Sequence, residues 1–285
     1  MNRLVDREFW DARHAAGIGA AVSAAPAPRG GFVRRLFDAA RTSLGAEPRT
    51  SYAEYLVWQT FRSHLPVRSD WRAIEIGSAP GRNLVRLHRW FNYEPFGVEY
   101  SPTGAEQTRE ALRRSGFDAA HVIEADFFSP DFQQRHRGRF DLVLSRGFIE
   151  HFDDPASVVA AHVALLRRGG ILVCTVPNLL SAAYPFLALF GRDLLRAHNR
   201  RIMRLRRFQA LFEGCDLETR HCGYRGLCQF FGVSLRTEDS LRGRLAGAMD
   251  RAGDLMNHGM FLLLRGRAVE TRWSPHLVYI GQKTR

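Results

Sequence analysis

Apolar runs and helix-like repeats alternate along the middle of the chain. Helical patterns, one of which begins near Pro102 and ends before Gly116, separate short apolar runs. The runs typical of buried strands are 72–77, 95–101, 119–126, 140–146 and 171–177. The helical patterns between them are 81–91, 102–116 and 155–170. Such alternation predicts a parallel sheet with helices on both faces.

The two ends of the chain carry other patterns. Residues 51–66 are amphipathic and end at Pro66. Residues 179–214 are helical in pattern, aromatic and rich in arginine. Two more strands are expected at 217–224 and 274–283, and the residues between them, 225–272, form a mostly helical insertion.

The size and ends of the chain limit its class. A length of 285 residues fits one α/β domain with added pieces, and 45% hydrophobic residues suffice for a sizeable core. No apolar run approaches the roughly 18 residues of a membrane-spanning helix. The first ten residues are charged and lack the apolar centre of a secretory signal, so we expect a cytoplasmic protein.

Charge and cysteine content leave several partners open. The net charge is +12, and Lys283 is the only lysine, so the arginine usage indicates a genomic bias. The positive charge is nevertheless compatible with nucleic acid, anionic lipid or acidic small molecules.

The cysteines lack the close C-x2-C pairs of structural zinc sites, so we expect reduced thiols and no metal. They are Cys174, Cys215, Cys222 and Cys228.

The turn after the first predicted strand carries the most specific signal. It lacks the lysine of a phosphate-binding loop, and a dinucleotide motif would need glycine at Ala79 and Arg82. Glu75, Gly77 and Gly81 do fit the spacing acid-x-Gly-x-x-x-Gly. This pattern suits S-adenosylmethionine, whose methionine moiety needs backbone space but no phosphate site. An acid at Glu75 would help to order this turn and to hold the ammonium group of such a ligand.

Polar residues end the following strands at suitable intervals. Glu99 ends the second strand and can accept both ribose hydroxyls. Asp126 ends the third strand, where an acid can accept from the adenine amine and Phe127 or Phe128 can line the ring. Ser145 and Arg146 end the fourth strand, beside the reactive sulfonium.

These motifs together resemble the class I S-adenosylmethionine-dependent methyltransferases. "IEIGSAPG" resembles the first motif of that family, "GVEYS" the second and "EADFF" the third. "FWDARH" resembles the N-terminal helix that covers the cofactor in the ubiquinone-biosynthesis-like, small-molecule branch. The resemblance adds further cofactor contacts: Ser78, Ala79, Leu84 and Tyr100.

The resemblance also implies a fold and a division of the chain. The expected fold is a doubly wound, Rossmann-like α/β fold with a seven-stranded, mostly parallel sheet, an antiparallel last strand and a helical lid. Residues 1–66 would form the N-terminal helical lid and 67–222 the cofactor-binding core. Residues 223–285 would supply the helical insertion and the final strand.

The catalytic candidates are histidines. The sulfonium donor is already activated, so the protein mainly positions the acceptor, and a base is needed only for a hydroxyl or a protonated amine. His151 follows the fourth strand, and His198 lies in a His-Asn pair beyond the fifth. A structural or capping role is an alternative for both, and Glu150 is interpreted as a loop or cofactor-shell residue. Six aromatic residues could line an acceptor pocket or belong to the core: Tyr52, Tyr55, Trp58, Tyr184, Phe186 and Phe190.

The acceptor is open at this stage. A small or medium biosynthetic acceptor, methylated on oxygen or nitrogen, fits best; it could be acidic or attached to a lipid or carrier. Seven arginines between Arg192 and Arg207 are a solvated face, a site for such an acceptor, or a contact with anionic membrane. The alternatives are an RNA or protein methyltransferase and a non-catalytic cofactor-binding subunit. The lysine-containing tetrad of RNA ribose methyltransferases cannot form around Lys283 alone, so nucleic acid is disfavoured.

Overall fold

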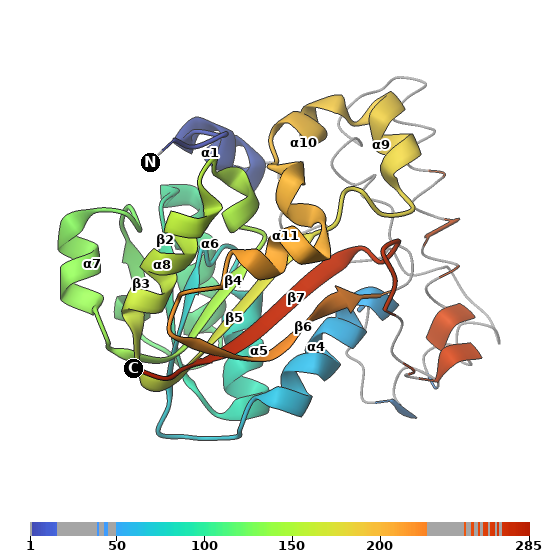
Figure 1. Cartoon of the computed structure of the whole chain (residues 1–285). Helices are drawn as coiled ribbons and strands as arrows, with labels where there is room; N and C mark the ends of the chain where they lie inside the picture. Colours follow the sequence, from blue (N-terminus) through green and yellow to red (C-terminus); the bar gives the residue numbers. More distant parts are fainter. Residues whose placement is uncertain are drawn as a thin grey trace.

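A mixed seven-stranded sheet forms the centre of the protein in a computed structural model (Figure 1). The structure describes residues 2–15, 50–226 and 270–285, together with isolated residues within 39–44 and 248–267. Most of the predicted insertion at 225–272 lies outside the described residues. The strand order is β3-β2-β1-β4-β5-β7-β6. The strands are β1 (Arg72–Ile76), β2 (Glu94–Glu99), β3 (Val122–Glu124), β4 (Phe140–Arg146), β5 (Leu166–Pro177), β6 (Leu217–Arg225) and β7 (His276–Lys283).

The predicted sheet is confirmed in its strands and in the direction of the last one. β1 to β5 pair in parallel, and β7 runs antiparallel to both β5 and β6. Strand order reverses between β1 and β4, which are neighbours at the centre of the sheet. In open sheets of this type the ligand site lies beyond the carboxyl ends of the strands at such a point.

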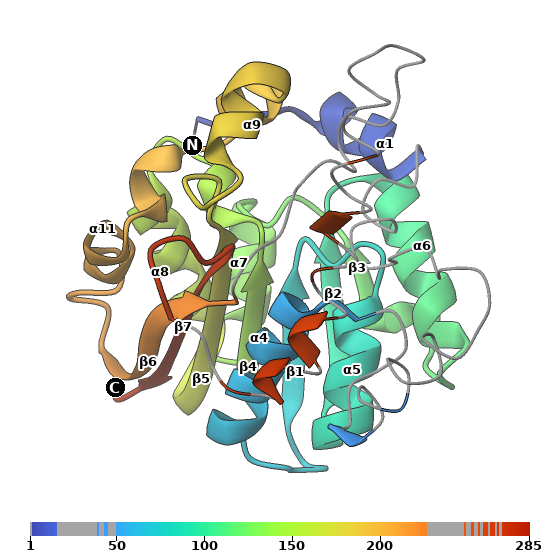
Figure 2. The ribbon, with the colours of Figure 1, turned by 90° about the vertical axis from the view of Figure 1, so that its right-hand side faces the viewer.

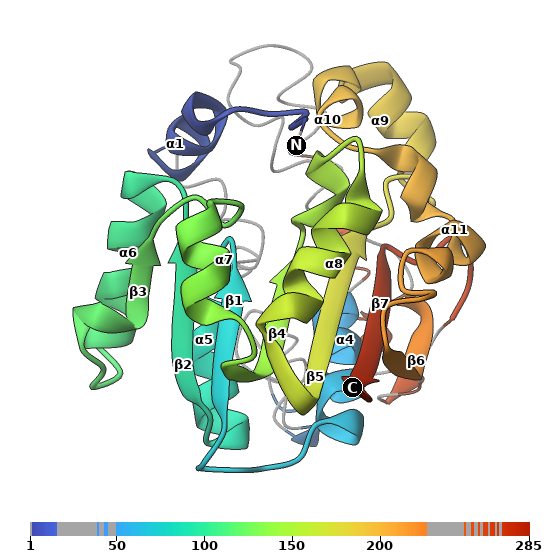
Figure 3. The same cartoon turned by 60° about the vertical axis from the view of Figure 1, so that its left-hand side comes forward.

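Helices cover both faces of the sheet. One face carries α4 (Tyr52–His64), α5 (Arg82–Phe91) and α6 (Pro102–Arg113), which lie in front of the strands in Figure 2. The other carries α7 (Pro130–His136), α8 (Pro155–Leu165) and α11 (Leu205–Ala210), which lie in front in Figure 3. Buried apolar side chains fill the space on both sides.

Three helices begin with the same local signal, a capping residue followed by proline. The side chains of Ser101, Ser129 and Asp154 accept from the backbone N–H three residues later, and proline occupies the next position. Proline costs little there, because the first N–H of a helix has no intrahelical partner. The start of α6 was predicted from Pro102 alone, whereas α7, which follows Ser129, was missed.

One predicted helix end was wrong. The helix predicted for 155–170 ends at Leu165, and β5 begins at Leu166. Leu166 is buried and pairs with Phe140 at the start of β4, so the sheet takes up this residue. Gly169, with a φ of 77°, stands inside the strand and does not end the helix.

Short helices stand over the carboxyl edge of the sheet. They are α1 (Arg7–Ala15), α9 (Tyr184–Phe190) and α10 (Arg192–Arg196), followed by the 3₁₀ turn η3 (Arg200–Met203), and α1 and α9 appear at the top of Figure 3. The predicted helical segment after β5 is thus a series of short helices. By contrast α4, which was predicted to belong to the lid, contacts β6 and β7 and packs on the sheet. No helix of the described residues has both the length and the apolar character needed to cross a membrane.

Candidate functional site

The carboxyl ends of β1, β2 and β4, with the segment after β3, enclose a pocket beneath α1. Two short turns border it: one lies between β1 and α5, and the other follows β4 and contains η2 (Ile149–His151). The predicted cofactor residues that line it are Gly77, Ala79, Glu99, Tyr100, Asp126, Phe127 and Arg146. Residues from four separate strands therefore meet as the sequence predicted.

The turn after β1 leaves backbone space beside an unsatisfied acid. Gly77 has a φ of 69°, and a Cβ there would lie 3.1 Å from Cδ2 of Phe148. Glu75 is buried; its Oε1 accepts from Asn83 Nδ2 at 2.6 Å, and its Oε2 has no described partner. Burial raises the pKa of Glu75 to about 8, although the Asn83 hydrogen bond opposes the shift. An unpartnered buried carboxyl oxygen suits a ligand ammonium group.

Glu99 is held in a fixed orientation at the end of β2. Its Oε1 accepts from the N–H groups of Tyr100 and Ser101 at 2.9 and 3.0 Å, and its Oε2 accepts from Ala79 N–H at 3.1 Å. Burial raises the pKa of Glu99, and these three hydrogen bonds oppose the increase. A carboxylate has about four acceptor positions, so one remains for a ligand hydroxyl.

Asp126 is engaged by the N-terminal segment. Its Oδ1 accepts from Arg3 at 2.5 Å and from Phe128 N–H at 3.0 Å. The Arg3 guanidinium also lies 4.5 Å from the ring centroid of Tyr100. Arg3 therefore contacts the acid that was predicted to receive the adenine amine, and no local pattern predicts this contact.

Besides Glu75, which is buried and does not line this pocket, four predicted cofactor contacts lie away from it. Leu84 is fully buried in the apolar core, and a Cβ at Gly81 would meet Ala111 at 2.9 Å, so that glycine serves the packing of α5 against α6. Ser78 and Ser145 are buried, and neither lines the pocket. The structure does not support direct contacts by these side chains.

Arg146 takes part in a buried ion network. Its Nη1 and Nη2 donate to Glu54 of α4 at 2.9 and 2.7 Å, and Nη1 also donates to Asn83 at 2.9 Å. Arg86 donates to the same carboxylate at 2.9 Å. Burial alone would raise the pKa of Glu54, but Arg146 and then Arg86 hold it well below its usual range. This network balances the charge of Arg146. It was not predicted, because Glu54 and Arg146 are 92 residues apart in the sequence.

The N-terminal segment crosses the pocket and continues into α1. Leu4 N–H donates to the carbonyl of His151 at 2.9 Å, and Arg3 forms an antiparallel bridge with Phe152. Trp10 of α1 contacts the His151 ring edge-on, with centroids 4.9 Å apart. The predicted N-terminal helix thus covers the pocket and contacts a predicted catalytic residue.

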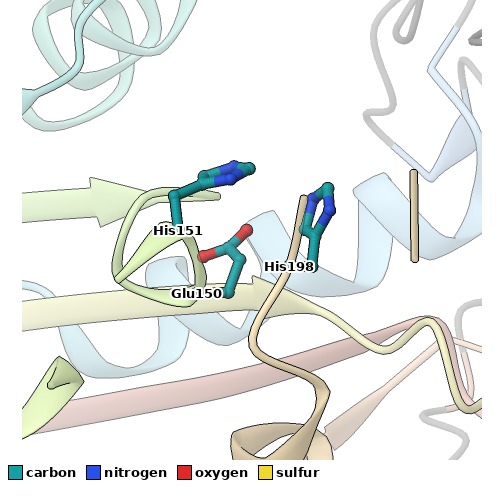
Figure 4. Close-up of side chains that lie close together, drawn as sticks. All are labelled: Glu150, His151 and His198. Atoms are coloured by element: carbon teal, nitrogen blue, oxygen red, sulfur yellow. The ribbon is translucent and has the colours of Figure 1, made fainter. Parts of the chain in front are cut away.

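Both predicted catalytic histidines lie together, with Glu150 between them (Figure 4). The two ring centroids are 4.4 Å apart, and donor atoms of all three side chains lie within 4.8 Å of one another. Burial lowers the pKa of both histidines, that of His198 to about 4, so both rings are neutral at pH 7. Burial also raises the pKa of Glu150 to about 8. The sequence analysis did not predict that Glu150 belongs to this cluster.

A second pocket adjoins the first at the cluster. The two share residues that form a common wall: Trp10, Arg13, Ala79, Arg146, Gly147 and His151. Four residues line the second pocket and not the first: Glu150, Thr175, Leu194 and His198. One pocket can therefore hold a donor while the other holds an acceptor.

The arginine-rich segment forms an exposed groove that reaches His198. Its lining includes Asn199 and the arginines Arg196, Arg200, Arg201, Arg204 and Arg207. Among the described ion pairs, Arg196 contacts Asp193, and the other four have no acidic partner. The groove is a positively charged surface next to the second pocket.

Most of the aromatic residues and cysteines singled out in the sequence lie outside the two pockets. Tyr52, Tyr55, Trp58 and Phe186 are buried in the core and do not line the two pockets, which agrees with the core interpretation. Tyr184 is partly exposed, and the side chain of Phe190 lies outside the described residues. Cys174 is buried, Cys215 and Cys222 are half-buried free thiols, and Cys228 lies outside the described residues.

Comparison with known proteins agrees with the fold and the motif positions. The family model described as "Methyltransferase domain" matches residues 74–174, which contain most of β1, all of β2 to β4 and most of β5. The fold and the matched segment define a class I, S-adenosylmethionine-dependent type of methyltransferase domain. The matched segment is similar to that methyltransferase domain family and makes up about a third of the chain.

Relatives and solved structures give the same class. The chain is 33% identical over 98 residues to a ubiquinone biosynthesis O-methyltransferase of Aromatoleum aromaticum, covering 33% of this chain and 42% of the relative. It is 31% identical over 125 residues to that of Methylococcus capsulatus, covering 44% and 50%. The chain thus spans half or less of these relatives. The geranyl diphosphate C-methyltransferase of Streptomyces coelicolor, solved with Mg²⁺, geranyl diphosphate and S-adenosyl-L-homocysteine, shares the fold with a TM-score of 0.57, 14% identity and 98% coverage of each chain.

Proposed function

We propose that the protein is an S-adenosylmethionine-dependent methyltransferase acting on an oxygen or nitrogen of a small or medium biosynthetic acceptor. The observation that carries this proposal is the pair of adjoining pockets, with Glu99 and Asp126 lining the first and Glu75 buried just before its Gly77 turn. Similarity to ubiquinone biosynthesis O-methyltransferases favours oxygen as the accepting atom. When bound, S-adenosylmethionine supplies an activated methyl group.

The chain binds and orients the cofactor through acids on successive strands. Glu75 receives the ammonium group with its unpartnered oxygen, and Glu99 accepts a ribose hydroxyl with its free acceptor position. Asp126 receives the adenine amine once Arg3 shifts from its present contact. Gly77 allows the methionine moiety to approach the backbone, and α1 excludes water from above.

The acceptor occupies the second pocket beside His151 and His198. Both rings are neutral, and their Nδ1 atoms contact backbone carbonyls, so Nε2 can take a proton from a hydroxyl acceptor. The arginine groove reaches His198 and can hold an acidic or carrier-linked part of the acceptor. The proposed division of the chain follows the sequence, except that α4 belongs to the packed core and not to the lid.

Calorimetry with S-adenosylhomocysteine tests the proposal. Glu99→Gln should weaken binding by about 1 to 3 kcal/mol, or roughly 5- to 150-fold, because a ribose hydroxyl loses its charged acceptor. Glu94→Gln is the matched control: it lies at the other end of β2, 45% exposed, and should leave affinity unchanged. Absence of binding by the wild type at millimolar ligand would refute the cofactor site.

A further inference from the structure

The arginine groove beside the second pocket carries positive charge that the described residues do not balance. Of the described residues that line it, five are arginines and one, Asp153, is an acid, which leaves an excess of four positive charges. Four of these arginines have no acidic partner in the part of the chain that the structure describes: Arg200, Arg201, Arg204 and Arg207. Like charges held together repel one another, so a multiply charged anion in the groove would be stabilised.

The backbone that carries these arginines is held in place. Their neighbours Ile202, Met203 and Phe208 are buried in the core, which leaves the arginine side chains exposed. The N–H of Leu205, between Arg204 and the rest of α11, donates to Tyr224 Oη at 3.1 Å. Because the scaffold is already ordered, a ligand loses little of its binding energy in arranging the backbone.

His198 links the groove to the second pocket, because it lines both. The two hollows also divide adjacent residues of one segment: Leu179 lines the pocket and Leu180 lines the groove. Asn199, in the lining of the groove, donates its N–H to the Glu150 carbonyl at 2.6 Å, which fixes the groove to the turn after β4. A ligand held in the groove can therefore extend past His198 into the pocket.

We infer that the arginine groove binds a phosphate ester or diphosphate group of the methyl acceptor. This inference rests on the proposed function and narrows its substrate class. The guanidinium fork matches phosphate oxygens with two parallel hydrogen bonds. A carboxylate would balance only one of the four excess charges, whereas a phosphate monoester carries about 1.5 to 2 negative charges near pH 7 and a diphosphate carries more. The charged group stays in the exposed groove, and the accepting atom lies in the second pocket.

Calorimetric titration of the full chain with pyrophosphate tests the inference without donor or acceptor. The wild type should bind pyrophosphate, more tightly than acetate, and the affinity should fall as salt is added. Replacing Arg200, Arg204 and Arg207 together with glutamine should weaken pyrophosphate binding by about 10-fold or more.

A second triple variant is the matched control. Arg135, Arg137 and Arg139 are also exposed, have no described acidic partner and lie outside the groove, in or just after α7. Replacing these three with glutamine lowers the net charge equally, but it should change pyrophosphate affinity by less than about 2-fold, because distant exposed charges are screened. Melting curves and S-adenosylhomocysteine binding show that both variants are folded.

Two further measurements locate the bound anion and its source. Pyrophosphate should shift the ring signals of His198 in NMR spectra and leave those of His88, which lines neither hollow, unchanged. The wild type should not co-sediment at physiological salt with vesicles of phosphatidylcholine and phosphatidylglycerol. Unmoved His198 signals would contradict a phosphate beside the acceptor pocket. Vesicle binding that the groove variant loses would assign the groove to lipid headgroups and overturn the inference.

The remaining outcomes separate this inference from the proposed function. No pyrophosphate binding by the wild type at millimolar concentration, or equal weakening in the two triple variants, would overturn the phosphate site. A chain that binds S-adenosylhomocysteine but no pyrophosphate contradicts only this inference. A chain that binds pyrophosphate in the groove but no S-adenosylhomocysteine contradicts the proposed function.

Discussion

The Glu54→Gln substitution should destabilise the protein strongly, because Glu54 neutralises two buried arginines. The side chains of Glu54, Arg86 and Arg146 are 14%, 12% and 13% exposed, so water cannot replace the lost charge. Removing one partner from a buried ion pair costs about 3 to 5 kcal/mol. At roughly 2 to 4 °C per kcal/mol, the melting temperature should fall by about 6 to 20 °C.

Urea denaturation at pH 7 measures the free energy directly. The pKa of Glu54 is depressed in the folded state, so its contribution is fully present above the ordinary pKa of glutamate and is lost as pH falls toward the folded value. The matched control is Glu106→Gln: Glu106 also contacts two arginines, but its side chain is 61% exposed, so the cost should stay below about 1 kcal/mol.

The comparison between these two variants can refute the reasoning. Equal losses in Glu54→Gln and Glu106→Gln would show that burial does not strengthen the Glu54 network. Adding Arg146→Met to Glu54→Gln should restore part of the stability, because it removes one uncompensated charge and leaves an apolar chain beside Trp58. A further large loss in that double variant would also contradict the account.

Three further changes test the cofactor pocket and the arginine groove. Binding of S-adenosylhomocysteine near pH 7 should release a proton and become stronger as pH rises toward about 8, because the ligand ammonium group favours ionised Glu75. Calorimetry in two buffers with different ionisation enthalpies measures the proton release. The Glu75→Gln variant should bind without releasing a proton. Gly77→Val should prevent binding in the same assay, since a Cβ lies 3.1 Å from Phe148 and φ is 69°; retained affinity would contradict the close approach. The third change replaces exposed groove arginines with glutamine: Arg200, Arg201, Arg204 and Arg207. It should raise the KM for an acidic acceptor in a salt-dependent way with cofactor affinity unchanged; an unchanged KM would leave the groove as a solvated face.

Periodicity and strand-end chemistry predicted the central sheet. Each of the strands β1 to β4 is bounded by a turn or cap signal in the sequence. The acids Glu75, Glu99 and Asp126 stand at or next to the ends of the first three strands. Parallel strands bring such ends to one edge, so the sequence alone could place them together. The short α7 was missed although Ser129 and Pro130 give the same signal as α6.

Contacts between distant segments could not be predicted in this way. Nothing in the local pattern indicates that Arg3 pairs with Asp126, that Glu54 pairs with Arg146, or that Glu150 and His198 face one another. These contacts depend on how the N-terminal segment, α4 and the segment after β5 pack over the sheet. The predicted cofactor contact of Ser145 was wrong, although this residue lies at the end of a strand. Successive side chains of a strand point to opposite faces, so a residue near a strand end can face the core instead of the pocket.

A crystal structure of the chain with S-adenosylhomocysteine tests the central claim most directly. The account predicts ribose hydroxyl oxygens within hydrogen-bond distance of Glu99, the homocysteine end beside Gly77, and the adenine next to Asp126. A well-ordered ligand bound elsewhere, or one in this pocket with its ribose turned away from Glu99, would contradict it.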